Sequence, residues 1–199
     1  MTQIEQTQHA KVFAGYWQDK GDEKQETQRY WIELLQEVLG VENPSRYIEF
    51  EKTVKIKHTN FIDAYISSTK VLIEQKGAKV DLTKPQEQSD GAMLTPYQQA
   101  KRYADELSYD LKPRWIVVSN FKEVHVHDMN NPHEEPEIIK LENLEKEYYR
   151  LQFLQVLSKS ACSQIRFCVA KSNPRGNFYL LKYSRSSSNT HYFFYIYAS

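Results

Sequence analysis

Two acidic residues and a lysine form the most informative spacing in the chain. Asp63 is followed, after ten intervening residues, by Glu74-Gln-Lys76. Carboxylate oxygens are hard ligands that suit Mg²⁺ or Mn²⁺. A lysine beside such a metal could position or deprotonate a water molecule, or stabilise charge on a phosphate oxygen. This chemistry requires the three side chains to meet, which depends on the elements that carry them.

The stretch 61–77 is typical of two short strands joined by a polar turn, because apolar and polar residues alternate on either side of the turn. If the turn is centred between positions 68 and 69, residues whose numbers sum to 137 face each other. Asp63 then lies opposite Glu74, and Lys76 follows on the same face. Like charges directly opposite destabilise a sheet, and a cation between them would remove that penalty. The alternative is a solvated strand end on which Glu and Lys occur by chance.

Helical segments are predicted before these strands. A short amphipathic helix is expected within residues 1–21, and Asp22 is a candidate N-cap for a helix over 23–39. Glu33 and Glu37 lie one turn apart on that helix. One of them could reach a metal at the acidic pair, although such residues more often form a solvated helix face.

A further strand over 47–57 alternates and comes directly before the acidic strands, so the three must form an antiparallel meander. The polar segment 77–91 follows. It is either a lid or DNA-contacting loop, in which Lys79 and Lys84 could contact phosphate, or a plain surface connection.

A well-marked helix start follows this loop. Thr95 is the expected N-cap, Pro96 the first helical residue, and Gln98 completes a capping box. Gln99 and Tyr103 lie four residues apart on the flank of the buried stripe. This Gln-x-x-x-Tyr pair resembles the accessory motif of RecB-like nucleases, and the resemblance implies that the two side chains help to hold the scissile phosphate.

The apolar run 115–118 predicts a strand that is covered on both faces. The next strand, over 123–128, places His125 and His127 on one face. They are either metal ligands or, as we expect, exposed histidines of an edge strand. A helix is predicted over 142–157.

Composition bounds the possible classes of protein. The 199 residues carry a formal net charge of zero, so a nucleic-acid-binding surface would have to be local. No apolar run approaches the ~20 residues of a membrane span. The first residues have no signal-peptide character, and the two cysteines, Cys162 and Cys168, form neither a disulfide framework nor a zinc site. We therefore expect a cytoplasmic protein with no membrane partner.

Charge is distributed unevenly along the chain. All 26 acidic residues lie in 1–150, whereas 151–199 carries six basic residues and no acidic one. We therefore predict two parts, a domain over 1–157, for which the resemblance described next implies a nuclease, and an atypical acid-free tail over 158–199 that is disordered or unrelated.

The acidic spacing resembles the PD-(D/E)xK nuclease core, with Ile62 in place of the usual proline before Asp63. Over residues 10–157 the sequence is similar to the N-terminal nuclease region of MmeI-like bifunctional restriction endonuclease–adenine-N6 DNA methyltransferases. The stretches that carry this similarity are Arg46-Tyr-Ile-Glu-Phe-Glu-Lys-Thr-Val-Lys, Phe61-Ile-Asp, Val71-Leu-Ile-Glu-Gln-Lys-Gly, Tyr97-Gln-Gln-Ala-Lys-Arg-Tyr-Ala and Pro113-Arg-Trp-Ile-Val-Val-Ser-Asn-Phe.

The resemblance implies an α/β (α+β) restriction-endonuclease-like fold, with a mixed central sheet, an antiparallel three-strand meander and flanking helices. It implies that Asp63 and Glu74 bind Mg²⁺, or Mn²⁺, that Lys76 assists the attacking water, and that double-stranded DNA is the substrate. The S-adenosylmethionine-dependent methyltransferase of the family has no counterpart, because neither its glycine-rich loop nor its catalytic motif occurs.

We therefore expect a truncated member that works with a methyltransferase or target-recognition domain or chain. The alternatives are an inactive remnant that serves as a DNA-binding module and a stand-alone RecB-like repair nuclease.

Overall fold

The computed structural model describes residues 1–56, 58–155, 167–172, 178–186 and 189–195. The chain divides into two units, Met1–Val156 and Leu157–Ser199. The first unit holds every acidic residue of the chain and all of the predicted site residues.

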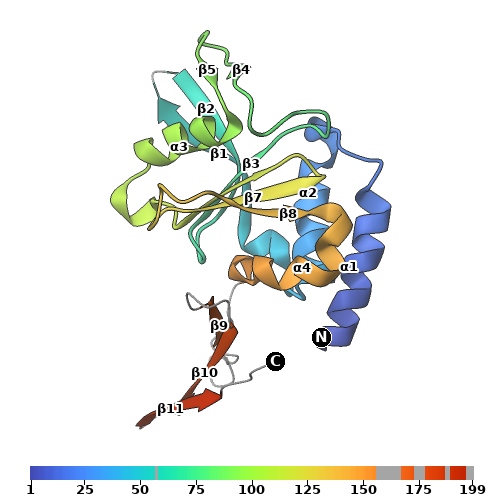
Figure 1. The fold of residues 1–199 in the computed structure, drawn as a ribbon. Helices are drawn as coiled ribbons and strands as arrows, with labels where there is room; N and C mark the ends of the chain where they lie inside the picture. Colours follow the sequence, from blue (N-terminus) through green and yellow to red (C-terminus); the bar gives the residue numbers. More distant parts are fainter. Residues whose placement is uncertain (57, 156–166, 173–177, 187–188, 196–199) are drawn as a thin grey trace. The chain divides into compact units, whose positions relative to one another are not determined.

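The helices and strands of the first unit come in groups along the chain (Figure 1): α1 and α2 precede β1 to β5, and α3 separates these strands from β6 to β8. Its principal elements, in chain order, are α1 (Gln3–Trp17), α2 (Glu23–Glu33), β1 (Ile48–Ile56), β2 (His58–Ile66), β3 (Val71–Gln75), β4 (Gln86–Glu87), β5 (Met93–Leu94), α3 (Pro96–Glu106), β6 (Trp115–Ser119), β7 (Glu123–Asp128), β8 (Glu137–Lys140) and α4 (Leu144–Glu147). Short π-helical and 3-10 turns lie at Leu34–Val38, Pro44–Arg46, Tyr109–Leu111, Leu141–Asn143 and Tyr148–Leu154.

Side-chain caps fix where the helices begin. The Asp22 carboxylate accepts hydrogen bonds from the backbone N–H groups of Lys24 and Gln25 at the start of α2. Thr95 and Gln98 form the predicted capping box of α3, with Pro96 in its first turn. These bonds satisfy backbone donors that have no partner within the helix. Both predicted helix starts are therefore confirmed.

Six strands form one sheet in the order β1-β2-β3-β6-β7-β8. Neighbouring strands are antiparallel except β3 and β6, which run parallel. The predicted three-strand meander is β1-β2-β3, and the continuous apolar run predicted as a doubly covered strand is β6, at the centre of the sheet. The predicted mixed α/β fold, with a meander in a sheet flanked by helices, is thereby confirmed.

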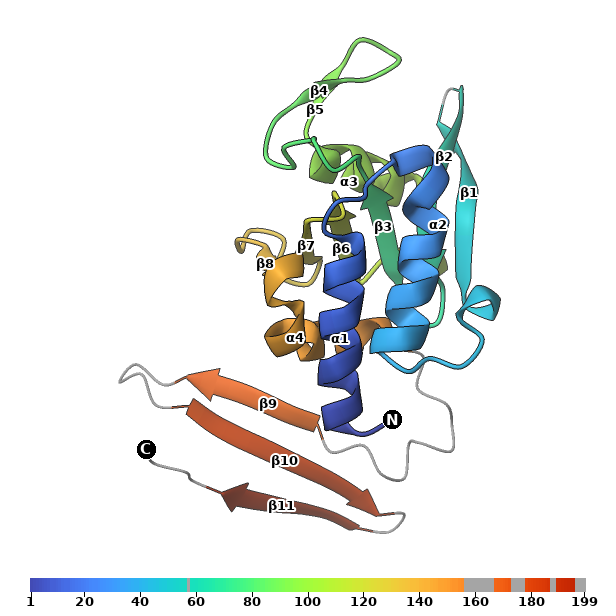
Figure 2. The same cartoon turned by 90° about the vertical axis from the view of Figure 1, so that its right-hand side faces the viewer.

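Helices cover both faces of this sheet, as Figures 1 and 2 show, with α1, α2 and α4 on one face and α3 on the other. The larger apolar cluster packs α1 and α2 against Ala64, Ile66, Val71, Ile73 and Val117. The smaller cluster packs α3 against Ile62, Tyr65, Leu72, Ile116 and Val118. Successive strand residues point to opposite layers, so the side chains of Leu72 and Glu74 lie on the α3 side.

Two predicted helices differ from those observed. The helix expected over 142–157 is instead a single α-helical turn, α4, between two 3-10 segments. The helix expected over 23–39 ends as an α-helix at Glu33 and continues through a π-helical turn. Apolar periodicity indicated which residues face the core, but it does not distinguish α from tighter or wider turns, which packing decides.

The second unit contains three strands, β9 (Phe167–Ser172), β10 (Phe178–Ser186) and β11 (Asn189–Tyr195), in an antiparallel sheet of order β11-β10-β9. That this tail is unrelated to the preceding region stays a prediction.

No helix in the part of the chain that the structure describes combines the length and the apolar character that crossing a membrane requires.

Candidate active site

The hairpin of β2 and β3 has the register that the sequence predicts. The paired residues are Ala64 with Ile73, Tyr65 with Leu72 and Ile66 with Val71, so each pair sums to 137. Asp63 and Glu74 come next along this register, where the ladder ends. In place of the next ladder bond, the Asp63 carboxylate accepts a hydrogen bond from the backbone N–H of Gln75, at 2.7 Å. The side chain of Asp63 is thereby fixed at the end of β3.

The other neighbour of Asp63 is also irregular. In the β1–β2 ladder, Phe50 pairs with Ala64 and Lys52 with Ile62, but the intervening Glu51 is not paired with Asp63. Glu51 has a φ of 52°, a conformation that is strained for a residue with a side chain. Ile62 packs in the α3-side cluster whereas Ala64 packs in the opposite one, so the predicted alternation breaks at Asp63. The sheet is distorted where the predicted metal ligand lies.

Glu74 is a buried carboxylate. Only 1% of it is exposed, and burial together with the Asp63 carboxylate raises the pKa of Glu74 to about 8. Its Oε1 contacts Lys76 Nζ at 2.6 Å, but its Oε2 is buried without a hydrogen-bond partner. A buried polar atom without a partner destabilises the fold, because it has lost its hydrogen bonds to water and forms none within the protein. The pKa of Asp63 is likewise raised, to about 6, chiefly by burial.

Lys76, which was predicted only to share a face with the acidic pair, forms an ion pair with Glu74. Burial lowers the pKa of Lys76, but the carboxylates of Glu74, Asp63 and Glu23 together outweigh this and the net pKa is raised. The backbone N–H of Lys76 donates to the carbonyl of Ser119, the last residue of β6, at 2.7 Å. The lysine is therefore a largely buried ammonium group, with 12% of its side chain exposed, held beside two carboxylates. The structure brings Asp63, Glu74 and Lys76 together.

Gln75 was not identified from the sequence. Its side chain points to the opposite face from Glu74, is fully buried, and accepts a hydrogen bond from Trp31 Nε1 of α2 at 2.9 Å. Its Nε2 donates to the carbonyl of Lys76 at 3.0 Å. Gln75 thus ties α2 to the strand end that carries the acidic pair. The available signal was a polar amide in an otherwise apolar strand that had to find a buried partner.

The helical acid near the site is Glu23, and not Glu33 or Glu37. The carboxylate of Glu33 accepts from Trp17 Nε1 at 3.0 Å and pairs with Arg29, and Glu37 is exposed, in keeping with the solvated helix face that was the favoured alternative. Glu23, at the start of α2, accepts from the backbone N–H of Gly77 at 2.9 Å. Its charge raises the pKa values of Asp63 and Glu74. Helix periodicity could not show this, because it does not reveal which end of a helix points toward the site.

The accessory pair also lies at the acidic centre. Gln99 Nε2 donates to Tyr103 Oη at 3.2 Å, while Gln99 Oε1 is buried without a partner. Burial raises the pKa of Tyr103, and the charges of Glu74, Lys76 and Asp63 also act on it. Since α3 packs on the face of the sheet that carries Glu74, these two side chains and the acidic pair share one side of the molecule.

The two histidines are not exposed edge-strand residues, and that prediction is wrong. Strand β8 pairs with β7, so β7 is internal. His125 is buried and lies 3.1 Å from a Glu123 oxygen, and His127 stacks on Tyr97 of α3 with ring centroids 3.8 Å apart. Burial lowers the pKa of His127 to about 4.

A metal ion bound here would have two protein ligands. Within the described ranges, no group of three or more His, Cys, Asp or Glu residues is placed so that it could hold a metal. Asp63 and Glu74 nevertheless provide hard oxygens, and the unpartnered Oε2 of Glu74 is the kind of buried atom that a cation would satisfy. Mg²⁺ commonly uses one or two carboxylates and completes its shell with water and substrate phosphates. The residues present therefore fit Mg²⁺.

Comparison with known proteins identifies a family. Neither the curated proteins nor the solved structures contain a match to this chain. Residues 3–164 match the family described as "MmeI, N-terminal domain". The matched residues include the helices, the six-stranded sheet and every residue of the site. The chain therefore belongs to the MmeI N-terminal domain family.

Proposed function

We propose that this chain is the nuclease region of a restriction enzyme and hydrolyses phosphodiester bonds of double-stranded DNA with Mg²⁺ as cofactor. The observation that carries the proposal is the buried Glu74, whose Oε2 has no partner although Asp63 and Lys76 lie beside it. A structural carboxylate at such depth would be fully hydrogen-bonded. Membership of the MmeI N-terminal family supports a restriction-enzyme context and, with it, contact with DNA.

Asp63 and Glu74 are the residues that would hold Mg²⁺, or Mn²⁺ in its place. When bound, the metal would polarise the phosphate and lower the pKa of a water molecule. The protein contributes a preformed position for it, because the hydrogen bond from Gln75 N–H orients Asp63 and burial keeps bulk water away from Glu74. A preorganised, water-poor site strengthens electrostatic interactions with developing charge.

Lys76 most directly stabilises negative charge. Its raised pKa means that it stays protonated near neutral pH, so it acts as a cation toward a phosphate oxygen or orients a water, and does not serve as the base. Gln99 and Tyr103 would hold the phosphate from the α3 side. Tyr103 Oη accepts a hydrogen bond from Gln99 Nε2, which leaves the Tyr103 O–H to donate to a phosphate oxygen, and the charges of Asp63 and Glu74 act on this hydroxyl. Sequence recognition would come from other domains or chains, as the family resemblance implies.

The test is nicking of supercoiled plasmid with Mg²⁺, together with calorimetric titration of Mg²⁺, on the 199-residue chain. Wild type should bind the metal and nick. Asp63→Asn should lose both, whereas Lys76→Ala should lose nicking and keep metal binding. Asp105→Asn is the matched control, because Asp105 is an exposed carboxylate paired with Lys101, outside the site.

Metal binding without nicking by the wild type would favour a remnant that retains the site but not the activity. If Asp63→Asn binds Mg²⁺ as tightly as the wild type, the acidic pair is structural and the proposed function is wrong.

A further inference from the structure

A basic hollow lies beside the candidate active site. It has a volume of about 440 Å³ and lies between the linker that joins α1 to α2 and the loop that follows β3. Its lining includes Lys20 from the linker, Lys79 from the loop and Lys122 from the turn between β6 and β7. Three segments distant in sequence therefore each contribute one lysine to the same concave surface.

These three lysines have no carboxylate partner among the residues that the structure describes. Lys20 Nζ lies over the ring of Tyr16, 4.6 Å from its centroid, and no ion pair forms at Lys79 or Lys122. Asp19 is the one acidic residue in the described lining of the hollow. By contrast, Lys84 of the same loop pairs with Asp81 at 2.9 Å. The hollow therefore carries uncompensated positive charge, which favours an anionic ligand.

The backbone around the hollow is held in place. The N–H of Ala78 donates to the carbonyl of Gly21 at 3.1 Å, and Asn120 Nδ2 donates to the carbonyl of Val80 at 2.8 Å. Gly21 has a φ of 142°, and a Cβ there would lie 2.3 Å from the Cβ of Ala78. Glycine is thus required for the linker to approach the loop this closely. The positions of Lys20 and Lys79 are consequently fixed relative to each other.

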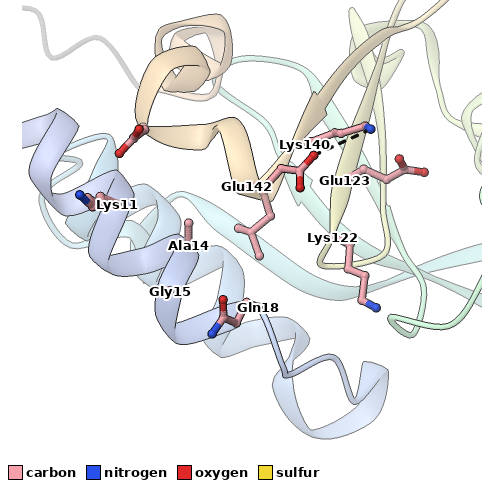
Figure 3. Close-up of a pocket in the computed structure, with 10 residues that line it drawn as sticks. Lys11, Ala14, Gly15, Gln18, Lys122, Glu123, Lys140 and Glu142 are labelled. Carbon is pink, nitrogen blue, oxygen red and sulfur yellow. Dashed lines mark ion pairs between the residues drawn. The ribbon is translucent and has the colours of Figure 1, made fainter.

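A neighbouring hollow shows that a concave surface with lysines is not enough. It has a volume of about 730 Å³ and shares Gln18 and Lys122 with the basic hollow (Figure 3). Lys122 lines both hollows, so the difference lies in the acids. The lining of the basic hollow has three lysines and one acid, whereas the three lysines of the neighbouring hollow are balanced by three acids, Glu123, Glu142 and Glu145. That balance removes the attraction for a polyanion, so the basic hollow is where phosphates would bind.

The basic hollow adjoins the acidic centre. Gly77, which lines it, directly follows Lys76, and Lys79 is only three residues beyond Lys76. Three residues span about 10 Å at most. One strand of B-DNA carries a phosphate for about every 3.4 Å of helix axis. A strand whose scissile phosphate lies at Asp63 and Glu74 would therefore place phosphates at the hollow within a few nucleotides.

We propose that Lys20, Lys79 and Lys122 form a phosphate-binding surface that holds the DNA backbone a few nucleotides from the scissile bond. Naming DNA as the ligand rests on the proposed nuclease function, whereas the affinity for phosphates rests on the hollow itself. Such contacts position the duplex and carry no sequence information. They would supply locally the positive charge that the chain as a whole, with a net charge of zero, lacks.

The test measures binding of a fluorescein-labelled 30-base-pair duplex of mixed sequence by anisotropy, in EDTA, across a KCl series. Each phosphate contact adds about 0.9 to the slope of log affinity against log salt concentration. The triple variant Lys20→Gln/Lys79→Gln/Lys122→Gln should lower that slope by about 2 to 3 and weaken binding at least about tenfold at 0.1 M KCl. Lys84→Gln, in the same loop but paired, should match the wild type.

Separate readouts distinguish the two proposals. If the triple variant keeps the wild-type slope, or if the wild type binds no duplex, the phosphate-binding surface is wrong, and Mg²⁺ binding and nicking still decide the nuclease function. If the triple variant loses binding but the wild type does not nick, the surface stands and the nuclease function fails. Thermal unfolding of each variant verifies that the substitutions leave the fold intact.

Discussion

Glu74 and Gln75 are adjacent in sequence, equally buried and both polar, yet they differ in how their polar atoms are used. On the α2 side, the Gln75 side chain both accepts and donates a hydrogen bond. On the α3 side, Glu74 keeps one oxygen without a partner and has a strongly raised pKa. A satisfied buried group stabilises a fold, whereas a deficient one costs stability and is retained where it serves chemistry. Under the proposed function, the two faces of one strand end would separate support from chemistry.

The largest expected effect is on activity. Glu74→Gln should lower the rate of Mg²⁺-dependent nicking at least about a hundredfold, because a neutral amide is a weaker ligand and removes charge from the site. The rate is measured on supercoiled plasmid at saturating enzyme. Nicking that survives this substitution would place Glu74 with Gln75 as a support residue.

The same substitution should change how the stability of the metal-free protein depends on pH. The folded-state pKa of Glu74, about 8, lies above its ordinary value of 4.5, so folding binds a proton and the contribution is lost as pH rises to 8. The unfolding free energy of the wild type should fall by about 2–3 kcal/mol between pH 6 and 8, and Glu74→Gln should remove most of that slope. Urea titrations in EDTA at a series of pH values measure the unfolding free energy. If it falls equally with pH in the wild type and in Glu74→Gln, Glu74 is not the source of the pH dependence.

Gln75→Leu tests whether the hydrogen bonds of Gln75 stabilise the fold. It leaves Trp31 Nε1 and the Lys76 carbonyl without partners, and should lower the unfolding free energy by about 2 kcal/mol. Trp31→Phe removes the same bond from α2, so the double variant should lose less than the sum of the two single effects. Additive losses in urea titrations would show that the two residues do not act together.

His127 should give a smaller pH effect of opposite sign. Its folded-state pKa, about 4, lies below the ordinary 6.5, so the unfolded chain binds the proton first and stability falls as pH drops from 6.5 to 4. Allowing for the solvent that reaches the ring, the loss should be about 1 kcal/mol. His127→Phe keeps the stacking on Tyr97 and should abolish that loss in thermal unfolding at pH 4.5 compared with pH 7.

Tyr103→Phe should produce the smallest effect. It removes the hydrogen bond with Gln99 and leaves the ring in place, so stability should change by no more than about 0.5 kcal/mol. Nicking should fall about three- to tenfold if the hydroxyl holds the phosphate, since one neutral hydrogen bond contributes about 1 kcal/mol. Equal nicking rates for the variant and the wild type would leave the pair a structural role only.

Local rules predicted much of this site. The turn at positions 67–70 and period-2 alternation were enough to give the register that brings Asp63 to Glu74. They were not enough to show the break at Glu51 and Asp63, because it arises from the unpaired position of Glu51, whose φ is positive, and alternation assumes an unbroken ladder. Glu23, Gln75 and the burial of the histidines were missed because tertiary contacts between distant segments create them. Periodicity shows which face of an element is buried but not what covers it.

The parallel pairing of β3 with β6 has a consequence for the order in which the molecule assembles. The β2–β3 hairpin closes over a four-residue turn, whereas pairing of Val71 with Trp115 must close a loop of more than forty residues. Closing a longer loop costs more conformational entropy, so the contacts that depend on it form later in folding. The two carboxylates thus meet early, while they are still hydrated, and the desolvation of Glu74 falls on a late step.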